Sequence, residues 1–448
     1  MGFTVEYSNP ELTTRAGFNK VAHLPFLMDS RPRYHDWGSE YLIDRGLGYW
    51  NPKTGFRGQR RRPPGPTSID NYATWLANFL SWVEARRKNV LELDYWADVF
   101  EEYQGQMQSG EWSEKGEPLK PSTFNPRVDV ACDFLRWMAA KGLRSDFEVP
   151  TETRSVRTTS ATSSVGHRAI QVEARQGKVP VSKEDLVMPT LAQVREWLGS
   201  VGVQSGATLQ LACETIVRTG LRLSELVGLR KDTLPENRRD WRISNPDAPA
   251  QKQEVLVKVK FGTKGPFYGW DHDDRIGPEG TIRIPLELAL KWHAYRQKYR
   301  HKSLALWVGN AATRAEKRDR IQESVHLFLN EKTGERLTQD NVYRAWKNKH
   351  GYRPFDQWRP HLGRDWWACA TLLQEVSKLE VIKKLGLEAS VQMVRDVSVQ
   401  IVDLRIRPQL RHRSKETTER YLVWVASQFS APIEVEYDAL LGVDEEGE

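Results

Sequence analysis

The stretch Arg411-His412-Arg413-Ser414-Lys415-Glu416-Thr417-Thr418-Glu419-Arg420-Tyr421-Leu422 decides how the rest of the chain is interpreted. Ser414 is suited to the N-terminus of a helix, because a serine hydroxyl accepts a hydrogen bond from a free amide of the first turn. The sequence therefore predicts a helix from Lys415 to about Phe429, with Tyr421 inside it and His412 just before it. A tyrosine in a helix is most often a packing residue, so a function for Tyr421 has to be argued from other segments.

Two further segments contain residues suited to binding a phosphate group. In Thr219-Gly220-Leu221-Arg222-Leu223-Ser224-Glu225-Leu226, glycine ends one helix, and Ser224 is expected to cap the next, so Arg222 lies in a tight junction. In His361-Leu362-Gly363-Arg364, the spacing of three residues places His361 and Arg364 on one face of a helix. The planar arginine fork can bind two phosphate oxygens at once and keeps its charge.

A lysine follows a strand pattern between these two segments. Apolar residues alternate with lysines from Val255 to Phe261, and Gly262-Thr263-Lys264-Gly265 comes directly afterwards. Residues 241–243 and 282–285 complete a predicted set of three short strands. A lysine in such a turn is most often solvated, and the segment lacks the spacing of a phosphate-binding P-loop.

In type and order, these residues resemble the tyrosine recombinase (phage integrase) family over about residues 67–430. The match includes the spacing of nine residues between His412 and Tyr421. The resemblance implies six catalytic residues: Arg222, Lys264, His361, Arg364, His412 and Tyr421.

The sequence departs from the family pattern at three positions and in one length. Gly363 and Asp365 flank Arg364 where the family usually has leucine and histidine, and Arg411 precedes His412 where glycine is usual. His412 follows Arg364 by 48 positions, roughly twice the family's spacing, so residues 378–407 are interpreted as an inserted element.

The resemblance implies a reaction that uses neither a cofactor nor a metal ion. Tyr421 would attack a DNA phosphate to form a 3′-phosphotyrosyl link, and Lys264 would protonate the departing 5′ oxygen, which leaves as a hydroxyl. The arginines and histidines would stabilise the charge that develops on the phosphate. A free tyrosine has a pKa near 10, so only about one in a thousand is ionised at pH 7 and Tyr421 needs help to lose its proton.

The predicted fold is multidomain and mainly α. Helical periodicity is strong between residues 67 and 150, and the resemblance identifies this block as a core-binding (SAM-like) domain. The resemblance makes residues 186–430 an α-rich catalytic domain with a small three-stranded antiparallel sheet. The remaining segments are a basic N-terminal extension without a predicted role (1–66), a Ser/Thr-rich linker (151–185) and an acidic C-terminal tail (431–448).

The charge of the chain favours DNA as its partner. The net charge of the 448 residues is +7, and the seven acidic residues after Pro432 leave residues 1–432 at +14. Double-stranded DNA is the expected partner, bound by a homo-oligomer (a tetramer on two sites), with accessory proteins as possible additions. There is no membrane-length apolar run, no secretory signal and no disulfide or zinc pattern, so a cytoplasmic, nucleoid-associated bacterial protein is expected.

Three other functions stay open at this level. A type IB topoisomerase uses similar chemistry, and a non-catalytic DNA-binding protein of the same fold would fit the changes at Asp365 and Arg411. A metal-dependent nuclease or transposase could be built on Asp271-His272-Asp273-Asp274. In the acidic tail, Ala439-Leu440-Leu441 could dock on a neighbouring protomer, or the tail could serve only solubility.

Overall fold

The structure is a computed structural model that describes residues 2–56, 63–158, 168–181, 186–263, 276–379, 391–411 and 416–429. These residues divide into two compact units: the first holds 2–158 and 168–181, and the second holds the described residues from 186 to 429. No helix within these ranges is long and apolar enough to cross a lipid bilayer.

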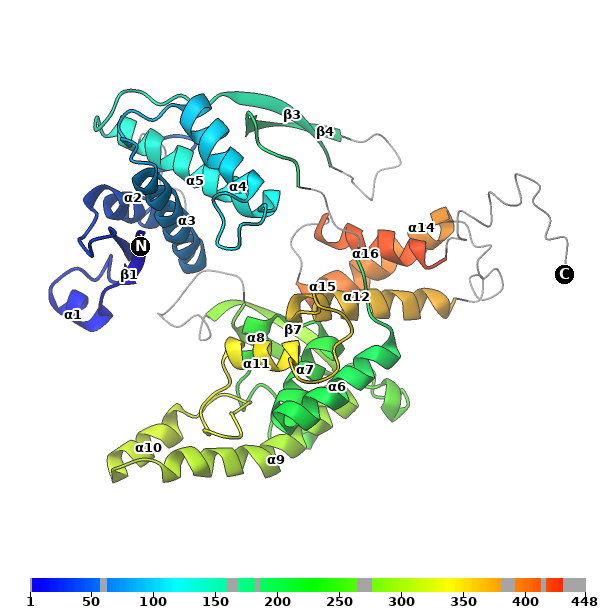
Figure 1. Cartoon of the computed structure of the whole chain (residues 1–448). Coiled ribbons are helices and arrows are strands. Elements are labelled where there is room, and N and C mark those ends of the chain that lie inside the picture. The colour runs from blue at the N-terminus through cyan, green and yellow to red at the C-terminus, as the bar shows by residue number, and fades with distance from the viewer. Residues whose placement is uncertain are drawn as a thin grey trace, which may run out of the picture. The chain divides into compact units, whose positions relative to one another are not determined.

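The first unit combines helices with two small antiparallel sheets (Figure 1). Its long helices α3 and α5 pack against each other, and each begins with a proline, whose missing amide costs no hydrogen bond in a first turn. The elements are β1 (Thr4–Tyr7), α1 (Pro10–Arg15), β2 (Pro25–Met28), α2 (Asp36–Gly46), α3 (Pro66–Ala85), the π-helix η1 (Tyr95–Gln104), α4 (Gly105–Ser109), α5 (Pro121–Ala140), β3 (Thr151–Thr158) and β4 (Arg168–Arg175).

The N-terminal residues share the hydrophobic core of this unit. Leu27 of β2, Tyr41 of α2 and Trp50 are buried in one cluster with Phe79 of α3 and Phe134 of α5. The sequence predicted an extension separate from the helical block. The structure differs because these residues are joined to the helices by long-range contacts, which leave no periodic pattern in the sequence.

A buried carboxylate fixes the N-terminal residues to α5. Asp133 accepts hydrogen bonds from the Tyr41 hydroxyl (2.7 Å) and the Trp50 indole (2.8 Å), and Arg45 lies 3.2 Å from it. Burial is the largest influence on the Asp133 carboxyl and raises its pKa, although Arg45 and the two hydrogen bonds oppose the shift. Removing the residues before α3 would leave this carboxyl buried without these partners.

A β-hairpin occupies much of the segment that was predicted to be a linker. β3 and β4 pair in antiparallel register from Thr151 opposite Arg175 to Thr158 opposite Arg168. Arg175 is buried and anchors the hairpin on the helices of the first unit, because it donates to the Tyr95 hydroxyl (2.9 Å). β-branched residues favour strands, and the Arg175 contact holds the hairpin to the unit, so a polar segment can form it.

The second unit contains most of the helices. Its elements are α6 (Leu191–Ser205), α7 (Ala207–Thr219), α8 (Leu223–Val227), the 3-10 helix η2 (Arg238–Asp240), β5 (Arg242–Ile243), the 3-10 helix η3 (Ala250–Lys252), β6 (Glu254–Phe261), β7 (Ile276–Pro285), α9 (Leu286–Gly309), α10 (Arg314–Glu323), α11 (Gln339–Lys347), α12 (Pro360–Ser377), α14 (Val391–Ile401), the π-helix η6 (Val402–Ile406), α15 (Arg407–Leu410) and α16 (Glu416–Ser427).

The predicted mainly helical fold with a small three-stranded antiparallel sheet is confirmed. The sheet has the order β5-β6-β7, with Val257 opposite Ile282. Val255, Val257 and Val259 are buried, whereas Lys258 and Lys260 point to solvent, as the alternation predicts. The third strand begins at Ile276, earlier than the sequence suggested, because its first residues carry no alternating pattern.

One predicted helix cap is wrong. The N-terminus of α8 is capped at Arg222 and not at Ser224, because the Glu225 carboxylate accepts a hydrogen bond from the Arg222 amide (2.8 Å). Ser224 instead donates its hydroxyl hydrogen bond to the carbonyl of Gly262 at the end of β6 (2.7 Å). This bond fastens the start of the β6–β7 connection to the helix that follows Arg222.

Helix α12 packs against both hydrophobic clusters of the second unit. Its Ala368 and Cys369 are buried in the cluster that includes Tyr421. Toward its N-terminus, a Cβ on Gly363 would lie 2.3 Å from the Trp346 ring, which belongs to the other cluster. The absence of a side chain at position 363 therefore allows the start of α12 to approach Trp346 closely, which fixes the position of the residues that follow.

Candidate active site

The first arginine lies at a sharply turned junction between α7 and α8. Gly220 ends α7 with φ of +67°, a left-handed conformation that glycine adopts without strain. A Cβ at this position would also lie 2.5 Å from the Leu410 side chain. Gly220 thus allows α15 to approach the segment that carries Arg222. The sequence predicted the turn at Gly220 but not this contact with α15.

Three arginines surround the buried carboxylate of Glu225. Arg222 Nη1 lies 2.7 Å from Oε1, Arg411 Nη2 lies 2.5 Å from Oε2, and Arg364 Nη1 lies 3.9 Å from Oε2. Burial acts to raise the pKa of Glu225, but the charges of Arg411 and Arg222 and a hydrogen bond from the Arg222 amide outweigh it, so the pKa is lowered. The ionised Glu225 therefore holds together arginines from three separate segments.

Arg364 is the most enclosed of the three arginines. Its side chain is 1% exposed, and its guanidinium donates to the backbone carbonyls of Gly220 and Leu410. Burial and, next, the charge of Arg222 lower its pKa to about 9, against the attraction of Glu225. The group remains charged at neutral pH, and its position is fixed by the backbone of the two segments that it joins.

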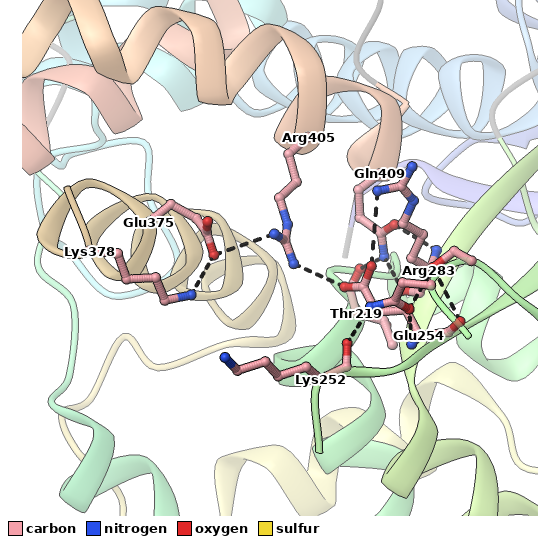
Figure 2. Close-up of polar contacts among 10 residues, drawn as sticks. Thr219, Lys252, Glu254, Arg283, Glu375, Lys378, Arg405 and Gln409 are labelled. Atoms are coloured by element: carbon pink, nitrogen blue, oxygen red, sulfur yellow. Dashed lines mark hydrogen bonds and ion pairs between the residues drawn. The ribbon is translucent and has the colours of Figure 1, made fainter. Parts of the chain in front are cut away.

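Arg411 has a left-handed backbone conformation, which glycine adopts with less strain than arginine. Its φ is +53° at the C-terminal cap of α15. Gln409, two residues earlier, fixes this end of α15: its amide accepts from the Arg283 amide (2.8 Å) and donates to the carbonyls of Arg283 (2.8 Å) and Thr219 (3.0 Å). Figure 2 shows these bonds between α15, β7 and the end of α7. The Arg411 side chain is directed to Glu225 by this frame.

A second link joins the same elements at their surface. Arg405 of η6 lies between Glu254 of β6 (3.0 Å) and Glu375 of α12 (3.4 Å), and Lys378 also contacts Glu375 (2.8 Å; Figure 2). Arg405 and Lys378 belong to the part of the chain interpreted as an inserted element (378–407), together with α14. The element packs on α12 and α16, and its Arg405 reaches β6 through Glu254.

Tyr421 lies inside the core of the second unit. It is 1% exposed, and its hydroxyl donates a hydrogen bond of 2.6 Å to Asp365 Oδ1. Burial, followed by the charge of Asp365 and this hydrogen bond, raises the pKa of Tyr421 well above its usual value. Arg420 Nη2 lies 3.6 Å from the other oxygen of Asp365. The phenol is therefore neutral and bonded to a carboxylate one residue after Arg364.

His361 occupies the first turn of α12, one turn before Arg364, and is exposed. Desolvation by neighbouring atoms is the largest influence on its imidazole and lowers its pKa, and Asp365 opposes the shift.

Lys264 and His412 lie outside the described residues, as do Ser414, the cluster Asp271–Asp274 and the tail from 431 to 448.

The structure thus brings Arg222, Arg364 and Tyr421 together, with His361 on the adjoining turn. The sequence analysis did not assign Asp365 and Arg411 to the site, although it singled both out as charged residues at unusual positions. Within the described ranges, no group of three or more histidine, cysteine or acidic residues could hold a metal ion.

Comparisons with known proteins give structural neighbours only. No protein-family model and no curated protein matches the sequence. Among solved structures, the XerH site-specific recombinase in a post-cleavage complex with difH is 15% identical (85% of this chain, 81% of that chain, TM-score 0.43). The Tn1549 transposon integrase with transposon-end DNA is also 15% identical (83% and 94%, TM-score 0.40). A lambda integrase dimer on a core site is 14% identical (81% and 90%, TM-score 0.37).

Proposed function

We propose that the chain is a tyrosine recombinase that catalyses site-specific DNA strand exchange through a covalent 3′-phosphotyrosyl intermediate. The observation that carries the proposal is the meeting of Arg222 and Arg364 at Glu225, with Tyr421 bonded to the residue after Arg364. These residues come from the junction before α8, from α12 and from α16.

The charges of the site support a phosphate as its ligand. Three arginines (Arg222, Arg364 and Arg411) face two carboxylates (Glu225 and Asp365), which leaves an excess of one positive charge. Arg222 and Arg411 keep part of their side chains accessible, 20% and 16%, so they can reach an anion from solvent. Arg364 is held by carbonyls and would act mainly through its charge, a fixed electrostatic contribution that needs no rearrangement during the reaction.

The proposed reaction conserves the energy of the broken phosphodiester. The Tyr421 oxygen bonds to phosphorus while the bond from phosphorus to the 5′ oxygen breaks. Lys264 gives its proton to the leaving 5′ oxygen, and His361 and His412 stabilise the phosphate oxygens with the arginines. A 5′ hydroxyl from a second duplex then attacks the phosphotyrosine and releases Tyr421. The chemistry needs neither ATP nor a metal ion.

The biological setting that we propose is a homotetramer on two double-stranded DNA sites, acting in integration, excision or transposition of a mobile element. The basic body of the protein supports a DNA partner, because lysines and arginines bind DNA phosphates and release counterions. We propose that the acidic residues after Pro432 contribute a contact between protomers.

The test is covalent capture of DNA. The chain is incubated with a library of nicked duplexes that have a randomised centre, non-covalent complexes are removed with detergent, and the attached strands are sequenced. We expect adducts with defined sites, formed in EDTA and attached through their 3′ phosphate. Tyr421→Phe should form none, whereas Tyr343→Phe, which removes a hydroxyl from a partly exposed tyrosine on α11, should leave the yield unchanged. Adducts that persist in Tyr421→Phe would refute the proposal.

A non-catalytic DNA-binding protein is the second candidate, because Tyr421 is buried and Arg364 is engaged by carbonyls. The same experiment decides between them: binding of duplex DNA without any adduct would support the second candidate. Relaxation of supercoiled plasmids without a defined site would instead support a topoisomerase.

A further inference from the structure

We propose that Asp365 is the proton acceptor for Tyr421 in DNA cleavage and the proton donor to it in strand joining. This inference rests on the proposed function, because it concerns the nucleophile of that reaction.

The contact has the geometry of a general base. The Tyr421 hydroxyl donates to Asp365 Oδ1 at 2.6 Å, within the range of about 2.6–3.2 Å expected between a base and the proton that it removes. Asp365 is 2% exposed, and its Oδ2 is buried without a hydrogen-bond partner among the described residues. The carboxylate thus has unused acceptor capacity beside the reacting oxygen.

The position of both groups is fixed by packing. Asp365 lies in the second turn of α12, between Arg364, which the backbone of two segments holds, and Ala368 and Cys369 in the core. Tyr421 is enclosed by the same core from α16. A base and a nucleophile that are held in this way need little reorganisation to exchange a proton.

The surroundings of Tyr421 offer no better acceptor among the described groups that influence it. Arg364 is a cation, and burial raises the pKa of the Cys369 thiol so that it stays neutral. Arg420 is likewise a cation beside Asp365. Burial also makes spontaneous ionisation of the phenol rarer than in water, which increases the need for an acceptor in contact with it.

The proton and the bonds balance in each direction. In cleavage, the Tyr421 O–H bond breaks toward Asp365 Oδ1 as the oxygen bonds to phosphorus and the 5′ oxygen leaves with a proton from the general acid. In joining, an incoming 5′ hydroxyl loses its proton to that acid, now acting as a base, and bonds to phosphorus. The departing Tyr421 oxygen then recovers its proton from Asp365. Asp365 ends each cycle as a carboxylate.

The opposite role for the same contact is restraint. A carboxylate that accepts the hydrogen bond also stabilises the neutral phenol, so Asp365 could hold Tyr421 inactive until DNA binds. The two roles predict opposite signs: removing the charge of a base slows cleavage, and removing a restraint accelerates it.

The first experiment measures the rate of adduct formation by the full-length chain on a duplex recovered by covalent capture. Asp365→Asn keeps the size of the side chain and an acceptor oxygen but cannot hold the proton. We expect its cleavage rate to fall at least about 100-fold, the low end of general-base contributions, with unchanged DNA affinity. Asp365→Glu, which keeps the carboxylate, should recover part of the rate. Asp340→Asn, the same change at an exposed position on α11, should have no effect.

The second experiment separates proton transfer from a structural role. Tyr421 is replaced by 3-fluorotyrosine, whose phenol is more acidic and depends less on a base. We expect this replacement to accelerate Asp365→Asn by about tenfold and the unaltered chain by less than about threefold. Equal responses in the two backgrounds would overturn the assignment, because a merely structural loss is not repaired by acidifying the phenol.

The outcomes distinguish this inference from the proposed function. If the unaltered chain forms Tyr421-dependent adducts and Asp365→Asn forms them as fast or faster, recombinase chemistry stands and the assignment of Asp365 is wrong. If the unaltered chain forms no such adduct, both proposals are wrong.

Discussion

Arg411 Nη2 lies 2.5 Å from Glu225 Oε2, although Arg411 must adopt a left-handed backbone conformation to reach it. The contact places a third arginine at the site. The backbone strain at Arg411 destabilises the fold, whereas its ion pair with Glu225 stabilises it. Substitutions at position 411 can measure the two contributions separately.

Replacing Arg411 by glycine or alanine should have unequal effects on stability. Both variants lose the ion pair, but alanine keeps the strain of φ +53°, whereas glycine relieves it. We therefore expect Arg411→Ala to be less stable than Arg411→Gly by about 1 kcal/mol. Hydrogen exchange of the α12 amides, read as the free energy of opening of the second unit, measures the difference. Equal values would mean that the backbone at this position relaxes without cost.

Replacing Glu225 by glutamine should destabilise the second unit and change its response to pH. Three arginines would lose their buried counter-ion, which we expect to cost about 3–5 kcal/mol at neutral pH. Because the folded-state pKa of Glu225 is lowered from 4.5, its stabilising contribution is present above pH 4.5 and is lost as pH falls through the lower, folded value.

The gap between the unaltered chain and Glu225→Gln should therefore be constant from pH 6 to 8 and shrink in acid. Urea unfolding of both chains, from pH 8 down to acid pH, tests this expectation. Glu335→Gln, at an exposed position of the same unit, serves as the control and should stay within about 0.5 kcal/mol. A gap that widens toward low pH would contradict the assignment of an ionised Glu225.

Two helical glycines should respond to alanine in opposite ways. In Gly363→Ala of α12, the new Cβ would lie 2.3 Å from the Trp346 ring, so overpacking should cost about 1–3 kcal/mol. In Gly199→Ala of α6, no atom lies within 4 Å of the new Cβ, so the higher helix propensity of alanine should stabilise the unit by up to about 1 kcal/mol. Thermal unfolding of the two variants measures both changes in stability. If both variants were stabilised or both destabilised, the packing described for α12 would be contradicted.

The two polar links of Figure 2 should differ in their contributions to stability. Gln409→Ala would leave the Arg283 amide and the carbonyls of Arg283 and Thr219 without their partner in a buried setting, at a cost of about 2–4 kcal/mol. Arg405→Ala removes ion pairs of a side chain that is 41% exposed and should cost less than about 1 kcal/mol. Chemical denaturation at matched pH and salt compares them, and a larger effect for Arg405 would invert this ranking.

The elements that could be predicted from the sequence are those whose signals are local. Thr190 and Gln193 form the capping box of α6, and Gly220 ends α7 as its position predicted. The alternation from Val255 to Phe261 located the central strand of the sheet because burial follows a period of two residues.

The relationships that could not be predicted depend on residues distant in the sequence. Asp365 and Arg411 were visible as departures from a motif, but their partners Tyr421 and Glu225 are set by how α12, α15 and α16 pack. The capping of α8 by Glu225 was missed because serine is the commoner cap and the carboxylate serves the arginines as well. The roles of the six residues in strand exchange stay predictions.

The sharing of one core between the N-terminal residues and α5 affects how the protein should be dissected experimentally. A truncated chain starting at Thr67 would expose the surface that Tyr41 and Trp50 cover and would strand Asp133 without its two hydrogen-bond donors. Such a fragment would aggregate or be degraded, and its inactivity would be mistaken for a direct role of the basic N-terminal residues in DNA binding. The arginines at positions 57, 60, 61 and 62 should therefore be neutralised one by one within the complete chain.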